Sequence, residues 1–175
     1  MSYRTEHDND RNPSTRNGPF SWSRFGRWFA LAIVLTAAAA FFGSMFLPGA
    51  WYASIRKPDW NPPNALFGPV WSVLYLMIAV AGGLVLAQAK DRLLPALWIL
   101  QLVLNGLWSY LFFGLKNPTL GLVEITLLWL SIGVFIAVAW RAQRRAALLM
   151  VPYWLWVTFA AALNFAIWRL NAQSL

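Results

Sequence analysis

The sequence predicts an all-α, polytopic membrane protein built as a bundle of five transmembrane helices. Of its 175 residues, 59% are hydrophobic and 11% are charged, whereas soluble domains are roughly 45–50% apolar. Five apolar stretches each reach the roughly 20 residues that a helix needs to cross about 30 Å of hydrocarbon. They cover about residues 27–47, 66–88, 94–114, 119–140 and 147–169.

The segment before the first stretch, residues 1–25, is polar, rich in Asn, Arg and Ser, and without helical periodicity. We expect it to be a disordered, basic tail. The stretch 27–47 is longer than the roughly 7–15 apolar residues of a signal peptide, so we interpret it as a true first span. The membrane domain then covers residues 26–171, and residues 172–175 form a C-terminal tail.

The loop before the second span, KPDWNPPNALFGPVW (57–71), combines prolines with large aromatic rings. Proline fixes φ at about −65° and suits the first turn of a helix, so Pro62 and Pro63 are expected to start the second span. A residue before proline avoids the α conformation, so residues 59–61 should run extended. A stiff segment of this kind would hold aromatic rings over the helix ends.

Three tryptophans in and around this loop, Trp51, Trp60 and Trp71, admit two interpretations. They are typical of the aromatic belt at a membrane interface. They also offer the large aromatic faces on which a flat ligand would stack.

The second span carries a small residue at every fourth position, at Ala79, Gly83 and Ala87. Such a track allows close helix approach, either within the bundle or across a dimer.

One face of the third span carries Gln101, Asn105 and Trp108 at helical spacing. Amides in hydrocarbon need hydrogen-bond partners, so this face should point into the bundle or into a cavity. The sequence leaves open whether it joins helices or lines a ligand site.

The fourth span holds an acidic residue, Glu124, about five positions past Thr119. This position would be shallow and close to the favourable dipole end of the helix. An intramembrane acid is a functional candidate by default, but without a second acid a proton relay has little support.

The fifth span has Trp156, Ala160, Leu163 and Asn164 on one face. A large ring followed one turn later by a small residue leaves room beside the ring. Either a ligand or a neighbouring helix would fill that room.

The basic residues are unevenly divided between the two sides of the membrane that five spans define. Ten of the 14 Lys and Arg residues fall on the side of the N-terminus, and the other four are Arg56, Lys57, Lys116 and Arg169. The positive-inside rule therefore predicts a cytoplasmic N-terminus and an outward-facing C-terminus. A helical bundle favours the inner membrane of a bacterium.

Conventional enzyme chemistry has no residues to carry it. The chain has no Cys, and its single His, His7, lies in the polar tail, so neither a thiol nucleophile nor a metal site is expected. No nucleophile elbow, phosphate loop or His/Asp/Glu cluster is present. The net charge of +8 follows from Arg residues that flank the spans, so no nucleic acid partner is expected.

Four longer motifs lie in the membrane domain: WYASIRKPDWNPP (51–63), GPVWSVLY (68–75), QLVLNGLWSYLFFG (101–114) and VPYWLWVTFAAALNFAIWRLN (151–171). Together they resemble the translocator protein family, also called tryptophan-rich sensory proteins or peripheral-type benzodiazepine receptors. The resemblance covers about residues 30–171, and therefore all five spans.

This resemblance implies a five-helix bundle in the lipid bilayer, usually a homodimer, with a ligand pocket between the helices. The first loop would cap the pocket on the side where the C-terminus emerges. The ligands implied are tetrapyrroles such as protoporphyrin IX and haem, sterols, and synthetic benzodiazepine-type drugs, with no cofactor required. Without His or Cys in the spans, haem would be held by stacking and burial rather than by a strong axial bond.

The resemblance also implies which residues bind. Trp71 and Trp156 match tryptophans implicated in light-dependent porphyrin degradation, so they are the candidate catalytic residues. The sterol motif of the fifth span has Tyr where this chain has Phe165, so sterol is not expected as the main ligand. The implied ligand-binding residues are Trp51, Trp60, Pro62, Pro63, Trp71, Asn105, Trp108, Trp156, Ala160 and Leu163.

The function implied is that of an integral membrane tetrapyrrole-binding protein that senses, carries or regulates porphyrins. Two alternatives stay open. One is a light-dependent porphyrin-degrading enzyme, and the other is a transporter of porphyrins or sterols, or a packing partner of other membrane proteins.

Overall fold

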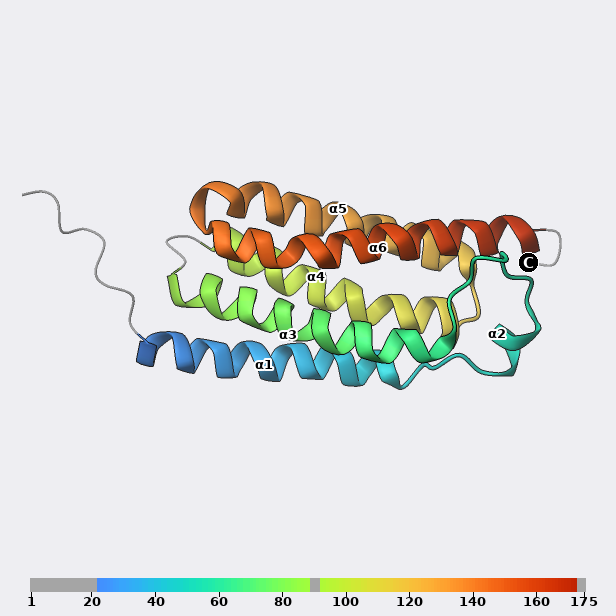
Figure 1. Ribbon diagram of the computed structural model, residues 1–175, viewed down its shortest axis with the longest axis horizontal. Coiled ribbons are helices and arrows are strands. Elements are labelled where there is room, and N and C mark those ends of the chain that lie inside the picture. The colour runs from blue at the N-terminus through green and yellow to red at the C-terminus, as the bar shows by residue number, and fades with distance from the viewer. Residues whose placement is uncertain (1–21, 89–91, 173–175) are drawn as a thin grey trace, which may run out of the picture.

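The helices of the molecule run side by side along one long axis (Figure 1). The computed structural model describes residues 22–88 and 92–172, and no strand occurs among them. Five helices in this part are long and apolar enough to cross a membrane, which confirms the predicted all-α, five-span fold. In chain order the elements are α1 (Trp22–Ser44), α2 (Ala50–Ser54), α3 (Asn64–Gln88), α4 (Leu93–Ser109), the π-helix η2 (Tyr110–Gly114), α5 (Pro118–Ala142) and α6 (Arg144–Asn171).

The long helices extend beyond the apolar stretches that predict them. α1 begins at Trp22, so residues 22–25 belong to a helix and not to the predicted tail. α6 likewise begins before and ends after the predicted span 147–169. Apolar residues mark only the hydrocarbon core, whereas helical hydrogen bonds continue into the headgroup region. The rest of the predicted tails, residues 1–21 and 173–175, lies outside the described residues.

The five long helices form a closed ring in the order α1, α3, α6, α5, α4 and back to α1. The backbones of the consecutive helices α3 and α4 come close at few positions, and α1 packs against both helices. Side chains of every helix can therefore meet in the middle of the bundle. α2 and the loop around it lie at the end of the bundle where α6 ends (Figure 1).

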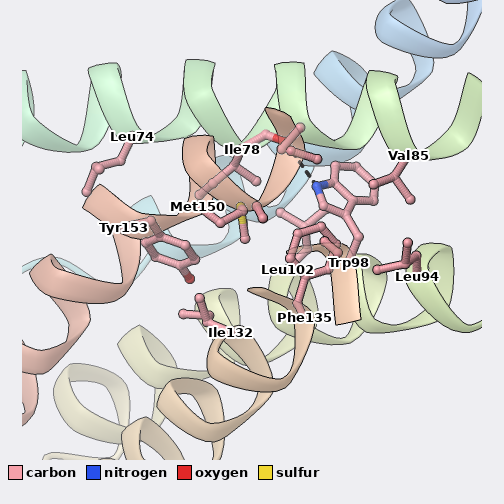
Figure 2. Close-up of a cluster of buried hydrophobic side chains, with 14 of the residues drawn as sticks. Leu74, Ile78, Val85, Leu94, Trp98, Leu102, Ile132, Phe135, Met150 and Tyr153 are labelled. Atoms are coloured by element: carbon pink, nitrogen blue, oxygen red, sulfur yellow. Dashed lines mark hydrogen bonds between the residues drawn. The ribbon is translucent and has the colours of Figure 1, made fainter. Parts of the chain in front are cut away.

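The half of the bundle away from α2 has a close-packed interior (Figure 2). Trp98 of α4 is fully buried there and crosses the ring to donate its indole N–H to the carbonyl oxygen of Ile78 on α3, at 3.0 Å. A Cβ at Gly82 would overlap the Trp98 indole, so glycine is required where the ring lies against α3. Ile132, Phe135 and Met150, all fully buried, complete this core.

The small-residue track of α3 packs inside this bundle. Ala79, Gly83 and Ala87 are all buried within the single chain. A Cβ at Gly83 would lie 3.0 Å from the Cα and Cβ atoms of Phe29 on α1. Of the two roles that the sequence left open, close helix approach within the bundle is therefore the one that the structure shows.

The first loop is less extended than the sequence predicts. Asp59 and Trp60 form a turn, closed by a 2.9 Å hydrogen bond from the Asn61 N–H to the Pro58 carbonyl. The prediction of an extended segment over 59–61 was wrong for its first two residues, because neither precedes a proline. Pro62 and Pro63 precede α3 rather than forming its first turn, which begins at Asn64.

This loop is fastened to the end of α6. The Arg56 N–H donates to Asn171 Oδ1 at 3.0 Å, and Asn171 Nδ2 donates back to the Arg56 carbonyl at 2.9 Å. Tyr52, in the short helix α2, is buried and donates its hydroxyl to Asn61 Oδ1 at 3.1 Å. The loop is therefore held across the end of the bundle by hydrogen bonds as well as by its prolines.

Candidate functional site

A cavity of about 530 Å³ occupies the half of the bundle next to the first loop. Every long helix contributes to its wall, as do Phe46, Leu47 and Pro48 from the start of the loop. Its volume lies within the roughly 300–1,000 Å³ of small-molecule sites. The closed ring of helices thus surrounds a packed core at one end and a hollow at the other.

Aromatic rings form much of the cavity wall. Trp71 from α3 and Trp108 from α4 both line it. Trp108 stacks on Phe112 of η2 with ring centroids 5.0 Å apart and planes inclined by 19°. Its indole N–H donates to Asn164 Oδ1 at 3.2 Å, and Asn164 Nδ2 in turn donates to the Pro118 carbonyl at 2.9 Å. These contacts fix the plane of Trp108 before any ligand enters.

The π-helix η2 brings two further rings into the wall. It follows α4 without a break and carries Phe112 and Phe113, both of which line the cavity. A π turn inserts an extra residue into the helix and is frequently found at functional sites. The chain then reverses through Lys116, whose φ of 53° is in the left-handed region, and enters α5 at Pro118.

A polar network lies between the cavity and the packed core. The Tyr75 hydroxyl donates to Asn105 Oδ1 at 2.9 Å, and Asn105 Nδ2 donates to the Tyr153 hydroxyl at 3.0 Å. Asn105 and Tyr75 also line the cavity. The amide therefore joins α3, α4 and α6, and it keeps one N–H and one lone pair for a ligand. Joining helices and lining a cavity prove compatible roles for this residue.

Gln101 lies on the other side of this boundary. It is fully buried and donates to the Trp98 carbonyl within its own helix at 2.8 Å. The face of α4 that carries Gln101, Asn105 and Trp108 therefore crosses from the packed core into the cavity.

Small residues make room beside the rings. Ala160 and Leu163 of α6 line the cavity, on the face for which the sequence left a ligand and a neighbouring helix open. Gly43 of α1 lies opposite Ser109 of α4, and a Cβ there would lie 3.4 Å from the serine Oγ. Both of these residues also belong to the lining.

Trp156 does not line the cavity in this structure. Its ring packs against Phe67 at a centroid distance of 5.9 Å and against Phe159 at 5.4 Å. Among the described residues that line the cavity, Phe67 is present and Trp156 is absent. Of the two candidate catalytic tryptophans, the structure therefore places Trp71 on the cavity wall and Trp156 against Phe67.

The loop residues predicted to bind lie above the cavity or outside it. Trp51 packs edge-on against Phe112, with centroids 5.8 Å apart. Trp60 is 50% exposed and touches Phe159. Pro62 and Pro63 line a separate hollow on the outer side of the loop. These residues form the cap, and none of the four borders the cavity in the part of the chain that the structure describes.

Tyr52 is a lining residue that the sequence did not single out. It follows Trp51 directly, and the helical turn of α2 points the tyrosine inward instead of the tryptophan. Burial raises the pKa of the Tyr52 hydroxyl, so the group stays neutral and able to donate. Without a helix in the predicted loop, no periodicity showed which ring faces in.

Glu124 is 3% exposed, and neither carboxylate oxygen has a hydrogen-bond partner among the described residues. It belongs to the buried face of α5 that also carries Gly121 and Ile125. Ile125 lines the cavity and Glu124 does not. No group of three or more His, Cys, Asp or Glu residues lies together anywhere in the described ranges.

Comparison with known proteins supports the motif resemblance. A model of the TspO/MBR family matches residues 31–169. Protein CrtK of Rhodobacter capsulatus is 42% identical over 147 residues, which cover 82% of this chain and 92% of that protein. Tryptophan-rich protein TspO of Chlorobaculum tepidum is 43% identical over 149 residues, covering 81% and 94%. Translocator protein of Homo sapiens is 36% identical over 140 residues, covering 75% and 82%.

The matched region begins within α1 and ends within α6, so it takes in the ring of helices, the cavity and the loop that caps it. The order and spacing of the motifs had implied the same relationship. The chain belongs to the TspO/MBR family of membrane proteins.

Proposed function

We propose that this protein binds a tetrapyrrole, protoporphyrin IX or haem, inside the membrane and acts as a sensor or carrier of porphyrins. The observation that carries the proposal is the cavity of about 530 Å³, which has Trp71 and Trp108 on its wall. A porphyrin is a large, flat and mostly apolar ring system. Offset stacking on an aromatic side chain contributes about 0.5–1.5 kcal/mol per pair beyond the burial of area.

The polar groups of the site suit binding better than covalent chemistry. Asn105 offers one amide contact, and its orientation is fixed by Tyr75 and Tyr153. The chain has no Cys and its single His is His7, so the cavity offers haem neither of these axial ligands. Stacking and burial would hold the ligand.

Porphyrin degradation is a weaker match to this geometry. That reaction was expected to use Trp71 and Trp156 together, and only Trp71 borders the cavity among the described residues. Illumination of the purified protein with protoporphyrin IX separates the two functions. A binding protein leaves the porphyrin spectrum changed only by the bleaching that a Trp71→Phe/Trp156→Phe variant also shows.

The charges at the two ends of the bundle support a cytoplasmic N-terminus. Arg27, Arg141 and Arg144 lie at the end where α1 begins, and Lys57 and Lys116 lie at the other. The natural chain has no Cys, so single-Cys variants at positions 144 and 116 report topology cleanly. An impermeant thiol reagent should label them from opposite faces, and labelling from one face would contradict this orientation.

Titration with protoporphyrin IX, followed by quenching of tryptophan fluorescence in detergent, tests the proposal. Trp71→Phe and Trp108→Phe keep most of the apolar area but reduce the stacking plane. Each should weaken binding by about 0.5–1.5 kcal/mol, a factor of about 2 to 13.

The matched control is Trp140→Phe. Trp140 is 43% exposed and lies at the opposite end of the bundle, under the Arg144 guanidinium. Its replacement should leave the affinity unchanged. If the control weakens binding as much as the two cavity variants do, the ligand does not occupy this cavity.

A further inference from the structure

A second hollow lies against the outside of the first loop. It measures about 630 Å³. Three residues, Pro48, Tyr52 and Asn64, line both this outer hollow and the inner cavity. The two spaces therefore adjoin along these three residues.

Lys57 supplies a positive charge to the wall of the outer hollow. Its ammonium donates to the carbonyl oxygens of Ala53 at 3.2 Å and Ile55 at 3.0 Å. It also lies 4.8 Å from the centre of the Tyr52 ring. An ammonium has three N–H donors, so one remains for another acceptor.

No acidic residue in the described ranges forms an ion pair with Lys57. The amide of Asn61, also on the wall, carries no charge: its oxygen accepts from Tyr52 and its Nδ2 donates to the Pro62 carbonyl at 3.1 Å. The lysine ammonium is therefore the charge on this wall that is left without a counter-ion. Its place is fixed by backbone carbonyls, so it does not need to move to meet an anion.

We propose that the outer hollow is the carboxylate subsite of the ligand site, with Lys57 as the residue that recognises it. The flat apolar body of the ligand occupies the inner cavity, and an acidic group on one edge extends past Tyr52 to the ammonium. This inference rests on the proposed function and names its ligand class: a planar ring system with one anionic edge. The same ring system without the charge should lose the contribution of Lys57.

Lys57 has a second possible role, because its two carbonyl bonds close the end of α2. A lysine that only stabilises the cap would affect charged and uncharged ligands equally. The test must therefore separate the charge of the ligand from the shape of the loop.

The experiment compares protoporphyrin IX with its dimethyl ester, which keeps the ring system and removes both negative charges. Both are titrated against the full-length wild-type chain in detergent and against Lys57→Met and Lys57→Arg. Lys57→Met should weaken binding of the diacid by about two- to fivefold, the range expected for a partly exposed ion pair. Binding of the ester should stay unchanged, and Lys57→Arg should keep the preference for the diacid.

Lys116→Met is the matched control, since Lys116 is exposed at the same end of the bundle and lines neither space. Equal weakening of acid and ester by Lys57→Met would overturn the inference and leave the lysine as a structural residue of the cap. Unchanged affinity of Lys57→Met for both compounds would overturn it as well, while the cavity remained a porphyrin site. Failure of the wild-type chain to bind either compound would instead overturn the proposed function and the subsite with it.

Discussion

Trp98 and Trp108 lie on the same helix, but Trp98 is in the packed core and Trp108 borders the cavity. Trp98 is fully buried, with Gly82 against its ring and its N–H on a backbone carbonyl of α3. Trp108 borders the cavity and donates its indole N–H to Asn164. Both indole N–H groups are satisfied, so hydrogen bonding does not distinguish the two residues. The packing around each ring does.

One bundle of five helices is thus closely packed in one half and hollow in the other. In the packed half, a large side chain crosses the centre and the facing residue is glycine. In the hollow half, rings stack along the wall, as Trp108 does on Phe112, and small residues such as Ala160 lie between them. Hydrogen bonds from Asn105 and Asn164 hold this wall in place where packing is absent.

The largest expected effect belongs to the packed half. Trp98→Ala leaves a cavity at a fully buried site, and we expect the free energy of unfolding to fall by about 3–5 kcal/mol. Trp108→Ala should cost less stability, because part of that ring already borders empty space, and should reduce porphyrin affinity more. Unfolding in detergent, paired with porphyrin titration of the folded fraction, measures both. Equal losses of stability would remove the distinction between the halves.

The boundary between the halves should be the next most sensitive position. Asn105→Leu leaves the Tyr75 and Tyr153 hydroxyls without their amide partner. Stability should fall by about 1–3 kcal/mol, the cost of buried polar groups left unpaired. Adding Tyr75→Phe removes one of these hydroxyls and should restore part of the loss. A double variant less stable than Asn105→Leu would show that the network does not act as described.

The smallest effect on stability is expected at the cap. Asn171→Ala removes both hydrogen bonds between α6 and Arg56, and each is worth about 1 kcal/mol. Their loss should release the loop and leave the packing of the five long helices intact, so the melting temperature should change little. Amide exchange over residues 55–57 and porphyrin dissociation should both become faster. Ser54→Ala removes only a bond within the loop, to the Trp51 carbonyl, and serves as the control. Equal dissociation rates in the two variants would mean that the hydrogen bonds between Asn171 and Arg56 do not retain the ligand.

The sequence predicted the spans well because the membrane dictates their length and composition. It also predicted that Ala160 and Leu163 share a face. Periodicity cannot say which neighbour that face meets, and this is why Trp156, one turn earlier, was misplaced. The position of Trp156 depends on its contact with Phe67 of α3. That contact exists because α3 packs beside α6 in the bundle, and no periodic pattern in the sequence shows which helices are neighbours.

The loop was the least predictable region for a related reason. Its conformation depends on single long-range contacts such as Arg56 with Asn171, 115 residues away in the chain. Proline rules predicted a stiff segment, but they did not reveal the turn at Asp59 and Trp60 or the short helix that points Tyr52 inward. Local preferences restrict the backbone, and tertiary contacts select among the conformations that remain.

The central claim, that the cavity is the ligand site, is tested most directly by filling it. Ala160→Phe adds a ring to the cavity wall, and its matched control Ala162→Phe adds the same ring to an exposed position of the same helix. We expect Ala160→Phe to reduce protoporphyrin IX affinity by at least about tenfold, a loss of about 1.4 kcal/mol, and Ala162→Phe to leave it unchanged, with both variants folded. Wild-type affinity in Ala160→Phe would show that the ligand binds elsewhere.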